Sequence, residues 1–301
     1  MNATRGDLDQ WQPSAPRQCW AGVSLDRPLV MAILNATPDS FSGGGRRADP
    51  GEAIAAGLRM AAEGADIIDV GGESTRPGAA SVTPELEQDR VLPIIEALAA
   101  AGLRVSVDTR NAATMRAALS AGASIVNDVS ALAHDASSAG VVAAAGCPVV
   151  LMHMRGNPAT MQAEAVYADV AAELRAEVSV RIEAALRAGV RPDRIAIDPG
   201  IGFAKRAPHS LAVLRGLPDL AGLGYPIVVG VSRKSFIATV AGQSTAGQRL
   251  GGSLAAGLYS VLRGASILRV HDVRETVQAI RIWQALFAPG TVPLPQRPPF
   301  D

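Results

Sequence analysis

Four side chains that accept hydrogen bonds stand at the ends of apolar segments of this chain: Asp69, Asp108, Asn127 and Asp198. Three carboxylates and an amide gathered in one place are costly to bury unless a ligand or a shared proton satisfies them. A heterocycle with several N–H donors would satisfy them well, because ionised carboxylates only accept hydrogen bonds. A single such Asp would indicate a structural cap, whereas four in register favour a ligand site.

Positive side chains form a second group near the ends of the second, seventh and eighth apolar segments. They are Arg76, Arg233, Lys234, Arg269 and His271. Arg269 and His271 are two residues apart, so in a strand they point to the same side. Such a pair suits a polyanionic leaving group, since charge-assisted hydrogen bonds to phosphate oxygens are strong. Solvated surface charge is the weaker interpretation, because both residues lie in an otherwise apolar segment.

Two further residues have both a chemical and a structural interpretation. The amide oxygen of Asn35 suits Mg²⁺, which prefers oxygen ligands and keeps several waters. Taken alone, however, an Asn before Thr37-Pro38 is better explained as a turn residue. Ser235 is expected to start a helix, where its hydroxyl and backbone N–H would hold a carboxylate. A plain N-cap explains Ser235 equally well.

Eight segments with a strand-like composition must position these side chains. Each begins with four to six apolar, mostly β-branched residues, as a strand buried on both faces does. They span residues 30–40, 66–78, 104–110, 124–130, 148–156, 194–203, 226–235 and 266–273. Ala-rich stretches with helical periodicity separate them. Eight alternating units of this kind predict an α/β fold, a (β/α)8 TIM barrel, whose active site lies at the carboxyl ends of the strands.

The expected helices follow from caps and terminal glycines. They span residues 49–64, 83–102, 111–122, 136–146, 166–189, 209–220, 247–264 and 272–287. Residues 17–29 are expected to form a short N-terminal hairpin, with a turn at residues 26–28, that plugs the bottom of the barrel. The long loops after strands 1 and 2 (residues 37–49 and 71–83) have the composition of lids that exclude water, or of plain surface loops.

Composition limits the class of protein. The chain has 301 residues, 48% of them hydrophobic, with 28 Lys and Arg against 28 Asp and Glu. A single barrel domain over residues 17–288 fits that length, with a flexible segment at 1–16 and a Pro-rich tail at 289–301. Zero net charge gives no case for nucleic acid or membrane as a partner. No apolar run approaches a membrane span or signal peptide, so a soluble, cytoplasmic protein is expected.

Common motifs of other chemistries are missing from the sequence. It has no phosphate-binding P-loop, no Gly-x-Gly-x-x-Gly after a strand and no Gly-x-Ser-x-Gly. Cys19 and Cys147 are far apart and make no metal-ligand pattern or disulfide framework. The residues therefore predict an enzyme with three subsites: a pocket for a nitrogen heterocycle, an anion site near the eighth strand, and a carboxylate site beside the seventh.

The motifs of this chain resemble those of a known enzyme family. NATPDSFS, DVGGESTRPG, VDT, ND, LMHMRGNPATMQ, DPGIGFAK, SRKS and RVHDV resemble the motifs of dihydropteroate synthase, in order and spacing, over residues 28–287. The resemblance implies a transferase of folate biosynthesis. It would condense 6-hydroxymethyl-7,8-dihydropterin pyrophosphate with p-aminobenzoate, through a cation-like (SN1-type) pterin. It also implies a Mg²⁺ cofactor, a homodimer formed through the last helices, and a target of sulfonamides.

The resemblance assigns the residues to subsites. Asp108, Asn127, Met152, Asp198, Phe203 and Lys234 would bind the pterin. Asn35, Arg76, Arg269 and His271 would bind pyrophosphate, with Asn35 on the metal. Phe41, Thr75, Pro77, Arg233 and Ser235 would form the p-aminobenzoate site. The catalytic set would be Lys234, Arg269, His271, Asp108 and Asp198.

The chain departs from the family pattern at three positions. Gly43 replaces an Asp common in the first loop, Ala204 replaces a common Gly, and Ala238 stands where Gly often follows SRKS. Two alternative functions compete with the synthase. A methyltetrahydrofolate-type methyltransferase shares the barrel and pterin pocket, but SRKS and RVHDV argue against it. A non-catalytic paralogue would have lost residues of the loops or anion site, whereas this chain lacks only the Asp at Gly43.

Overall fold

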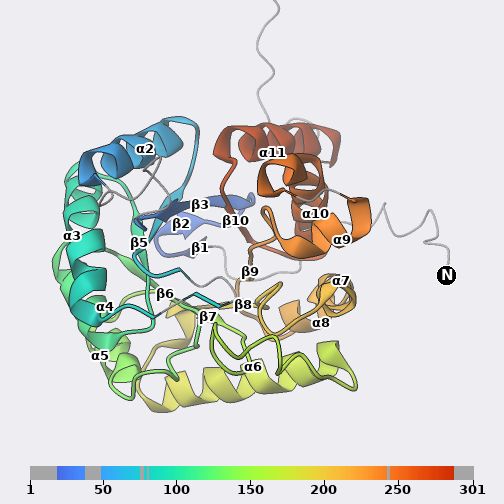
Figure 1. Ribbon diagram of the computed structural model, residues 1–301, viewed down its shortest axis with the longest axis horizontal. Coiled ribbons are helices and arrows are strands. Elements are labelled where there is room, and N and C mark those ends of the chain that lie inside the picture. Colours follow the sequence, from blue (N-terminus) through green and yellow to red (C-terminus); the bar gives the residue numbers. More distant parts are fainter. Residues whose placement is uncertain (1–18, 38–48, 75–77, 80, 243–244, 288–301) are drawn as a thin grey trace, which may run out of the picture.

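Eight parallel strands form a barrel surrounded by helices (Figure 1). The computed structural model describes residues 19–37, 49–74, 78–79, 81–242 and 245–287. Neighbouring strands follow the order β8-β7-β6-β5-β4-β3-β10-β9. The ring closes between the ends of that order through a bridge from Ile197 to Ile227, where the Ile197 N–H donates to the Pro226 carbonyl at 2.9 Å. The predicted (β/α)8 barrel is therefore confirmed.

The barrel strands are short and fall inside the predicted apolar segments. They are β3 (Leu29–Asn35), β4 (Ile67–Gly71), β5 (Val105–Asp108), β6 (Ile125–Asp128), β7 (Val149–Met152), β8 (Ile195–Asp198), β9 (Val228–Val229) and β10 (Ile267–Val270). Their side chains alternate between two cores. In β3, Val30, Ala32 and Leu34 pack in the larger core with the helices, whereas Leu29 and Met31 point into the barrel. Burial on both sides explains the continuous apolar runs.

The helices that follow the strands mostly match the predicted ranges. They are α2 (Pro50–Ala62), α3 (Pro84–Ala100), α4 (Ala112–Ser120), α5 (Ser138–Ala145), α6 (Val170–Arg187), α7 (Ala207–Arg215), α8 (Leu217–Ala221), α9 (Ser235–Ala241), α10 (Leu250–Leu262) and α11 (Val273–Phe287), with 3-10 turns η2 (Pro192–Arg194) and η3 (Ala246–Arg249). The caps are as expected: Asp49 accepts from the Gly51 N–H at 2.9 Å, and Thr83 accepts from the Leu86 N–H at 3.3 Å.

Two predicted helices have different bounds. The helix expected over residues 209–220 begins at Ala207 and is divided at Gly216 into α7 and α8. The helix expected from residue 166 begins at Val170 instead. There Asp169 accepts hydrogen bonds from the N–H groups of Ala171 and Ala172, so the helix starts at this cap rather than at the apolar residue upstream.

The predicted hairpin closes the bottom of the barrel. Strands β1 (Cys19–Trp20) and β2 (Val23–Ser24) pair around a two-residue turn at Ala21 and Gly22, whose φ angles are 51° and 72°. The hairpin turn therefore does not lie at residues 26–28, where it was predicted. Positive φ at both central residues is what a tight hairpin of this type requires. Trp20 is 1% exposed and packs on the first inward residues of the strands, and its Nε1–H donates to the Arg194 carbonyl at 3.0 Å.

No helix among the described residues is both long enough and apolar enough to span a membrane. The predicted terminal segments at 1–16 and 289–301 lie outside the described residues, as does most of the first long loop.

Candidate active site

The inward side chains change from apolar to polar along the barrel axis. In β4, Ile67 packs in the bottom layer with Trp20, Asp69 comes next, and Gly71 lies at the mouth. Strand register places Gly71 level with Asp108 and Asn127, and Asp69 level with Ser106, one step deeper. The carboxyl ends of the strands therefore bring the predicted acids and amide together, as a barrel active site requires.

Arg269 joins these acids into one network. Its Nε donates to Asp69 Oδ2 at 2.6 Å, and its Nη2 donates to Asp108 Oδ2 at 2.5 Å. The Nδ2 group of Asn127 donates to the same Oδ2 of Asp69 at 3.0 Å. Asp108, Asn127 and Arg269, predicted from three distant motifs, are thus in contact with each other or with Asp69.

The burial of this network shifts the pKa values of its members. Burial raises the pKa of Asp108 to about 7, against the opposing effect of the Arg269 charge. Burial alone would lower the pKa of Arg269, but the charges of Asp69 and Asp108 outweigh it and raise that pKa. Burial also raises the pKa of Asp198, although its Oδ1 accepts the Gly200 N–H at 2.7 Å. The mouth is therefore able to accept hydrogen bonds from a ligand and holds a permanent cation.

An apolar wall lies beside the acids. Met152 and Phe203 belong to one small buried cluster with Val129, Met161 and Ala204. The Nζ of Lys234 lies 4.1 Å from the centroid of the Phe203 ring, a cation–π distance. Burial lowers the pKa of Lys234 to about 8, with the Arg269 charge acting in the same direction. A flat ring bound at the acids would have this wall against it.

The loop that carries Phe203 has a demanding backbone. Gly200 and Gly202 have φ angles of 64° and 82°, and a Cβ at Gly200 would lie 2.0 Å from the carbonyl oxygen of His153. Ala204, where the family pattern has Gly, has a φ of 47°. An L-residue in that region is strained, which explains why Gly is common there.

His271 and Asn35 lie on the basic side of the mouth. The Nδ1 of His271 is 3.0 Å from the Ser232 hydroxyl, which also accepts the His271 N–H at 3.2 Å. Burial, with the nearby charges of Arg233 and Arg269, lowers the pKa of His271 to about 4. Asn35 ends β3, which pairs directly with the strand that carries Arg269.

The donor set around Asn35 fits only an open metal site. Within the described ranges, no three His, Cys, Asp or Glu side chains are arranged to hold a metal. One amide oxygen fits a Mg²⁺ that keeps most of its waters and takes its other ligands from phosphate oxygens.

Arg233 and Ser235 flank Lys234 at the end of the seventh strand. Arg233 donates from Nε to Asp272 at 3.1 Å, and its backbone N–H donates to the Ser253 hydroxyl at 2.9 Å. Ser235 is the exposed first residue of α9, and Lys234 holds the N-cap position, so the plain N-cap interpretation of Ser235 is wrong. Arg233 therefore ties this end of the site to α10 and α11.

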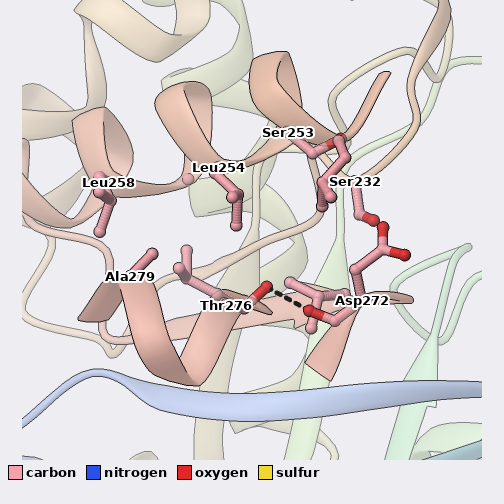
Figure 2. A pocket seen from close by; sticks show the side chains of 11 residues that line it. Ser232, Ser253, Leu254, Leu258, Asp272, Thr276 and Ala279 are labelled. Carbon is pink, nitrogen blue, oxygen red and sulfur yellow. Dashed lines mark hydrogen bonds between the residues drawn. The ribbon is translucent and has the colours of Figure 1, made fainter. Parts of the chain in front are cut away.

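A small cavity lies behind that connection. Figure 2 shows Ser232, Ser253, Asp272 and Thr276 among the residues that line it. Its volume of about 10 Å³ is room for roughly one water. It is therefore too small to be a substrate pocket.

Five residues of the predicted site and its loops lie outside the described residues. They are Phe41, Gly43, Thr75, Arg76 and Pro77.

Comparisons with known proteins now bear on this site. The chain matches the family model described as "Pterin binding enzyme" over residues 31–271. It is 46% identical to the dihydropteroate synthase of Mycobacterium leprae, over 86% of this chain and 94% of that protein. The chain belongs to the dihydropteroate synthase family.

The structure is also similar to solved structures of family members. The Xanthomonas albilineans synthase with 4-aminobenzoic acid has a TM-score of 0.84 and 48% identity, over 90% of this chain and 96% of that one. The same organism's synthase with 7,8-dihydropteroate has a TM-score of 0.82 and 45% identity, over 92% of this chain and all of that one.

Sequence reasoning missed a buried network behind the apolar wall that Met152 and Phe203 form. Lys205 is 3% exposed, and its Nζ lies 2.8 Å from His153 Nδ1 and donates to the Phe203 carbonyl at 3.0 Å. The other ring nitrogen of His153 is 2.8 Å from Glu177. The network joins the loops after β7 and β8. The available signal was a titratable residue, His153 or Lys205, in each of two motifs that follow buried strands.

Proposed function

We propose that this chain condenses 6-hydroxymethyl-7,8-dihydropterin pyrophosphate with p-aminobenzoate, giving 7,8-dihydropteroate and pyrophosphate. The observation that carries the proposal is the joining of an acceptor-rich pocket to a cationic one through Arg269, which contacts Asp69 and Asp108. A substrate with an N–H-rich ring and a pyrophosphate group needs both. The Xanthomonas relatives hold 4-aminobenzoic acid and 7,8-dihydropteroate, which are the second substrate and the product of this reaction.

The pterin would lie at the acids of the mouth. Asp108, Asn127 and Asp198 would accept its N–H donors, and Lys234 would donate to an acceptor on the ring. Met152 and Phe203 would pack on its faces, since they line the apolar wall. The raised pKa values of Asp108 and Asp198 fit this role. Burial disfavours the ionised carboxylates, so N–H donors from a ligand would stabilise them.

Pyrophosphate would lie at the basic side. Arg269 and His271 would donate hydrogen bonds to its oxygens, and Arg76 would add a third cation from the second loop. Asn35 would ligate a Mg²⁺ that arrives with the anion; the metal would offset charge that grows on the leaving group. With a pKa near 4 before binding, His271 is a neutral donor that an anion can convert into a cation.

The bond from the pterin methylene carbon to oxygen would break first. Ring nitrogens delocalise the positive charge left on that carbon, and Arg269 and His271 stabilise the negative charge on the departing oxygen. The aromatic amine of p-aminobenzoate would then attack the cation-like carbon and lose a proton. Closure of the first two loops over the mouth would keep water from intercepting the cation.

The p-aminobenzoate site would lie beside α9. Phe41, Thr75 and Pro77 would pack on its ring, and Ser235 would bind its carboxylate at the first turn of the helix. Arg233 would shape the site through its ion pair with Asp272. Sulfonamides would compete for the same site because they resemble p-aminobenzoate.

The proposal also covers the localisation and the oligomeric state. We expect a cytoplasmic homodimer that associates through α10 and α11. Ile282 and Leu286 on α11 and Tyr259 on α10 are exposed, which supports an apolar contact there.

The decisive experiment measures Mg²⁺-dependent release of pyrophosphate from the pterin substrate, with and without p-aminobenzoate. We expect pyrophosphate and dihydropteroate in equal amounts. Arg269→Ala should lower turnover by about 100-fold, since one preorganised charge-stabilising contact is lost, while circular dichroism stays unchanged. No turnover by the wild type, with the pterin substrate still bound, would favour the non-catalytic paralogue. Gly43→Asp would then be the first variant to make.

A further inference from the structure

We propose that Asp69 is the positioning residue that couples the pterin and pyrophosphate subsites. The inference rests on the proposed function and adds to it a residue that would contact neither substrate. A single carboxylate oxygen, Oδ2, accepts from Asn127 Nδ2 at 3.0 Å and from Arg269 Nε at 2.6 Å. Asn127 belongs to the pterin side of the mouth and Arg269 to the anion side, so one atom holds a residue of each subsite.

Asp69 lies too deep to bind substrate itself. It is fully buried, and register places it level with Ser106, one inward residue below Gly71 at the mouth. Its Oδ1 has no hydrogen-bond partner within the described part of the chain. A buried carboxylate is expensive to keep at the centre of a barrel unless it serves the groups around it. Here those groups are the amide and the guanidinium.

The first consequence concerns the orientation of the Asn127 amide. A carboxylate only accepts hydrogen bonds, so it selects the amide rotamer that turns the NH₂ group toward it. The amide oxygen of Asn127 must then face the other way, where it can accept an N–H from a ligand. Without Asp69 the amide could rotate by about 180° and offer a donor, which the N–H edge of a heterocycle would repel.

The second consequence concerns Arg269 and Asp108. Arg269 reaches both Asp69 and Asp108, so in the free enzyme it occupies Oδ2, one of the two Asp108 oxygens that could accept from the heterocycle. The hydrogen bond to Asp69 would keep Arg269 in place when Asp108 gives up its hydrogen bond to Arg269 and accepts a ligand N–H instead. If Asp108 were the only anchor, ligand binding would have to release the guanidinium altogether. Asp69 thereby lowers the competition between Arg269 and the pterin for Asp108.

Double-mutant cycles test this role, with 6-hydroxymethylpterin as the probe of one subsite and inorganic pyrophosphate as the probe of the other. We expect Asp69→Asn to weaken each probe by about 10-fold in calorimetry, as the loss of a charged hydrogen-bond partner does. In an Asn127→Ala background the same change should weaken the pterin by only about 3-fold, since the route through the amide is gone and only the route through Arg269 and Asp108 remains. In an Arg269→Ala background the pyrophosphate effect should shrink likewise.

A reversed pair provides a rescue that a purely structural role would not produce. Asn127→Asp alone would bring two carboxylates within hydrogen-bond distance and should weaken the pterin more than Asn127→Ala does. Combined with Asp69→Asn, the donor and acceptor are exchanged and the hydrogen bond returns. We expect the double variant to bind the pterin at least about 5-fold more tightly than Asn127→Asp alone.

The matched control is Asp66→Asn at the opposite end of the same strand segment. Asp66 accepts from Arg27 and from the Val30 N–H, far from the mouth, so both affinities should stay within about 2-fold of wild type. Equal losses from Asp69→Asn in all backgrounds, or no loss at all, would overturn the inference. Failure of wild type to bind either probe would instead refute the proposed function, so the two failures are distinguishable.

Discussion

Lys234 is one of the site residues whose charge responds to pH in the range where the enzyme is expected to work. Its pKa is lowered from 10.5 to about 8, so it is a cation below pH 8 and neutral above it. If the cation donates to the pterin, affinity for 6-hydroxymethylpterin should fall by about 10-fold per pH unit above pH 8. Calorimetry between pH 7 and 9.5 measures this. Lys234→Arg stays charged and should remove that decrease; an unchanged decrease would show that another group causes it.

The lowered pKa of Lys234 affects folding stability in the opposite direction to its expected effect on pterin binding. Between pH 8 and 10.5 the unfolded chain keeps a proton on Lys234 that the folded chain has lost, so this residue's contribution to stability rises with pH. Binding and folding should therefore respond in opposite directions above pH 8. A parallel decrease of both would indicate general alkaline unfolding.

For single residues, the sequence predicted which side chains come together at the mouth, but not which of them form hydrogen bonds with each other. Asp108, Asn127 and Arg269 were placed at one mouth because each ends an apolar segment. The link from Arg269 to Asp69 spans 200 residues, and that from Lys205 to His153 spans 52. Such pairs depend on the shear and closure of the barrel, which apolar periodicity does not encode. Asp69 was recognised as a strand end, but its depth below the mouth needed the register.

The loop after β8 is an element whose shape depends on one glycine. A Cβ at Gly200 would lie 2.0 Å from the His153 carbonyl oxygen, and its φ is 64°. Gly200→Ala should lower the free energy of unfolding by about 3 kcal/mol or more, since it combines a backbone clash with an unfavourable φ. Urea unfolding measures the loss.

Gly224 is the matched control for that loop. Its φ is 78°, but nothing lies within 4 Å of an added Cβ. Gly224→Ala should therefore cost only the conformational term, about 1–2 kcal/mol. Equal losses in the two variants would mean that the contact with His153 contributes nothing.

The β1–β2 hairpin is an element that serves stability rather than chemistry. Trp20 fills the bottom of the barrel, at the opposite end from Arg269. Trp20→Ala should lower the free energy of unfolding by about 3–5 kcal/mol through lost burial and a cavity. Turnover per folded molecule should stay within about 2-fold of wild type. A loss of turnover without a loss of stability in urea would contradict this separation.

Strands and most helices could be predicted because local signals agreed with the final packing. Pro at the first turn and Asp49 or Thr83 before it fixed two helix starts. The hairpin turn could not be located, because Ala21-Gly22 is a weaker turn signal than Asp26-Arg27-Pro28. The division at Gly216 was missed because the apolar pattern continues across it.

Over the whole molecule, stability and chemistry occupy opposite ends of one barrel. Trp20 and the first inward residues of the strands form a dry bottom layer, and the charged groups gather at the other end. Family membership and the barrel follow from patterns spread over the entire chain, which is why both could be predicted. How the site residues pair depends on strands far apart in the chain, so the contacts of Arg269 with Asp69 and Asp108 required the three-dimensional arrangement.

We predict that the chain forms a homodimer through the exposed apolar side chains of α11. Ile282 is 60% exposed and Leu286 is 72% exposed on α11, and such apolar side chains are costly to leave in water. Light scattering with size-exclusion chromatography should give twice the mass of the 31.0 kDa chain. Ile282→Lys with Leu286→Lys should shift it to the monomer, because two buried cations would face their symmetry mates. Val180→Lys, on the exposed face of α6, should leave the mass unchanged. A wild-type monomer would contradict the dimer, and a dimer unaffected by the α11 changes would show that the contact lies elsewhere.

Because α11 follows β10 directly, a dimer through this helix would also support the strand that carries Arg269. The monomeric variant should then bind pyrophosphate more weakly.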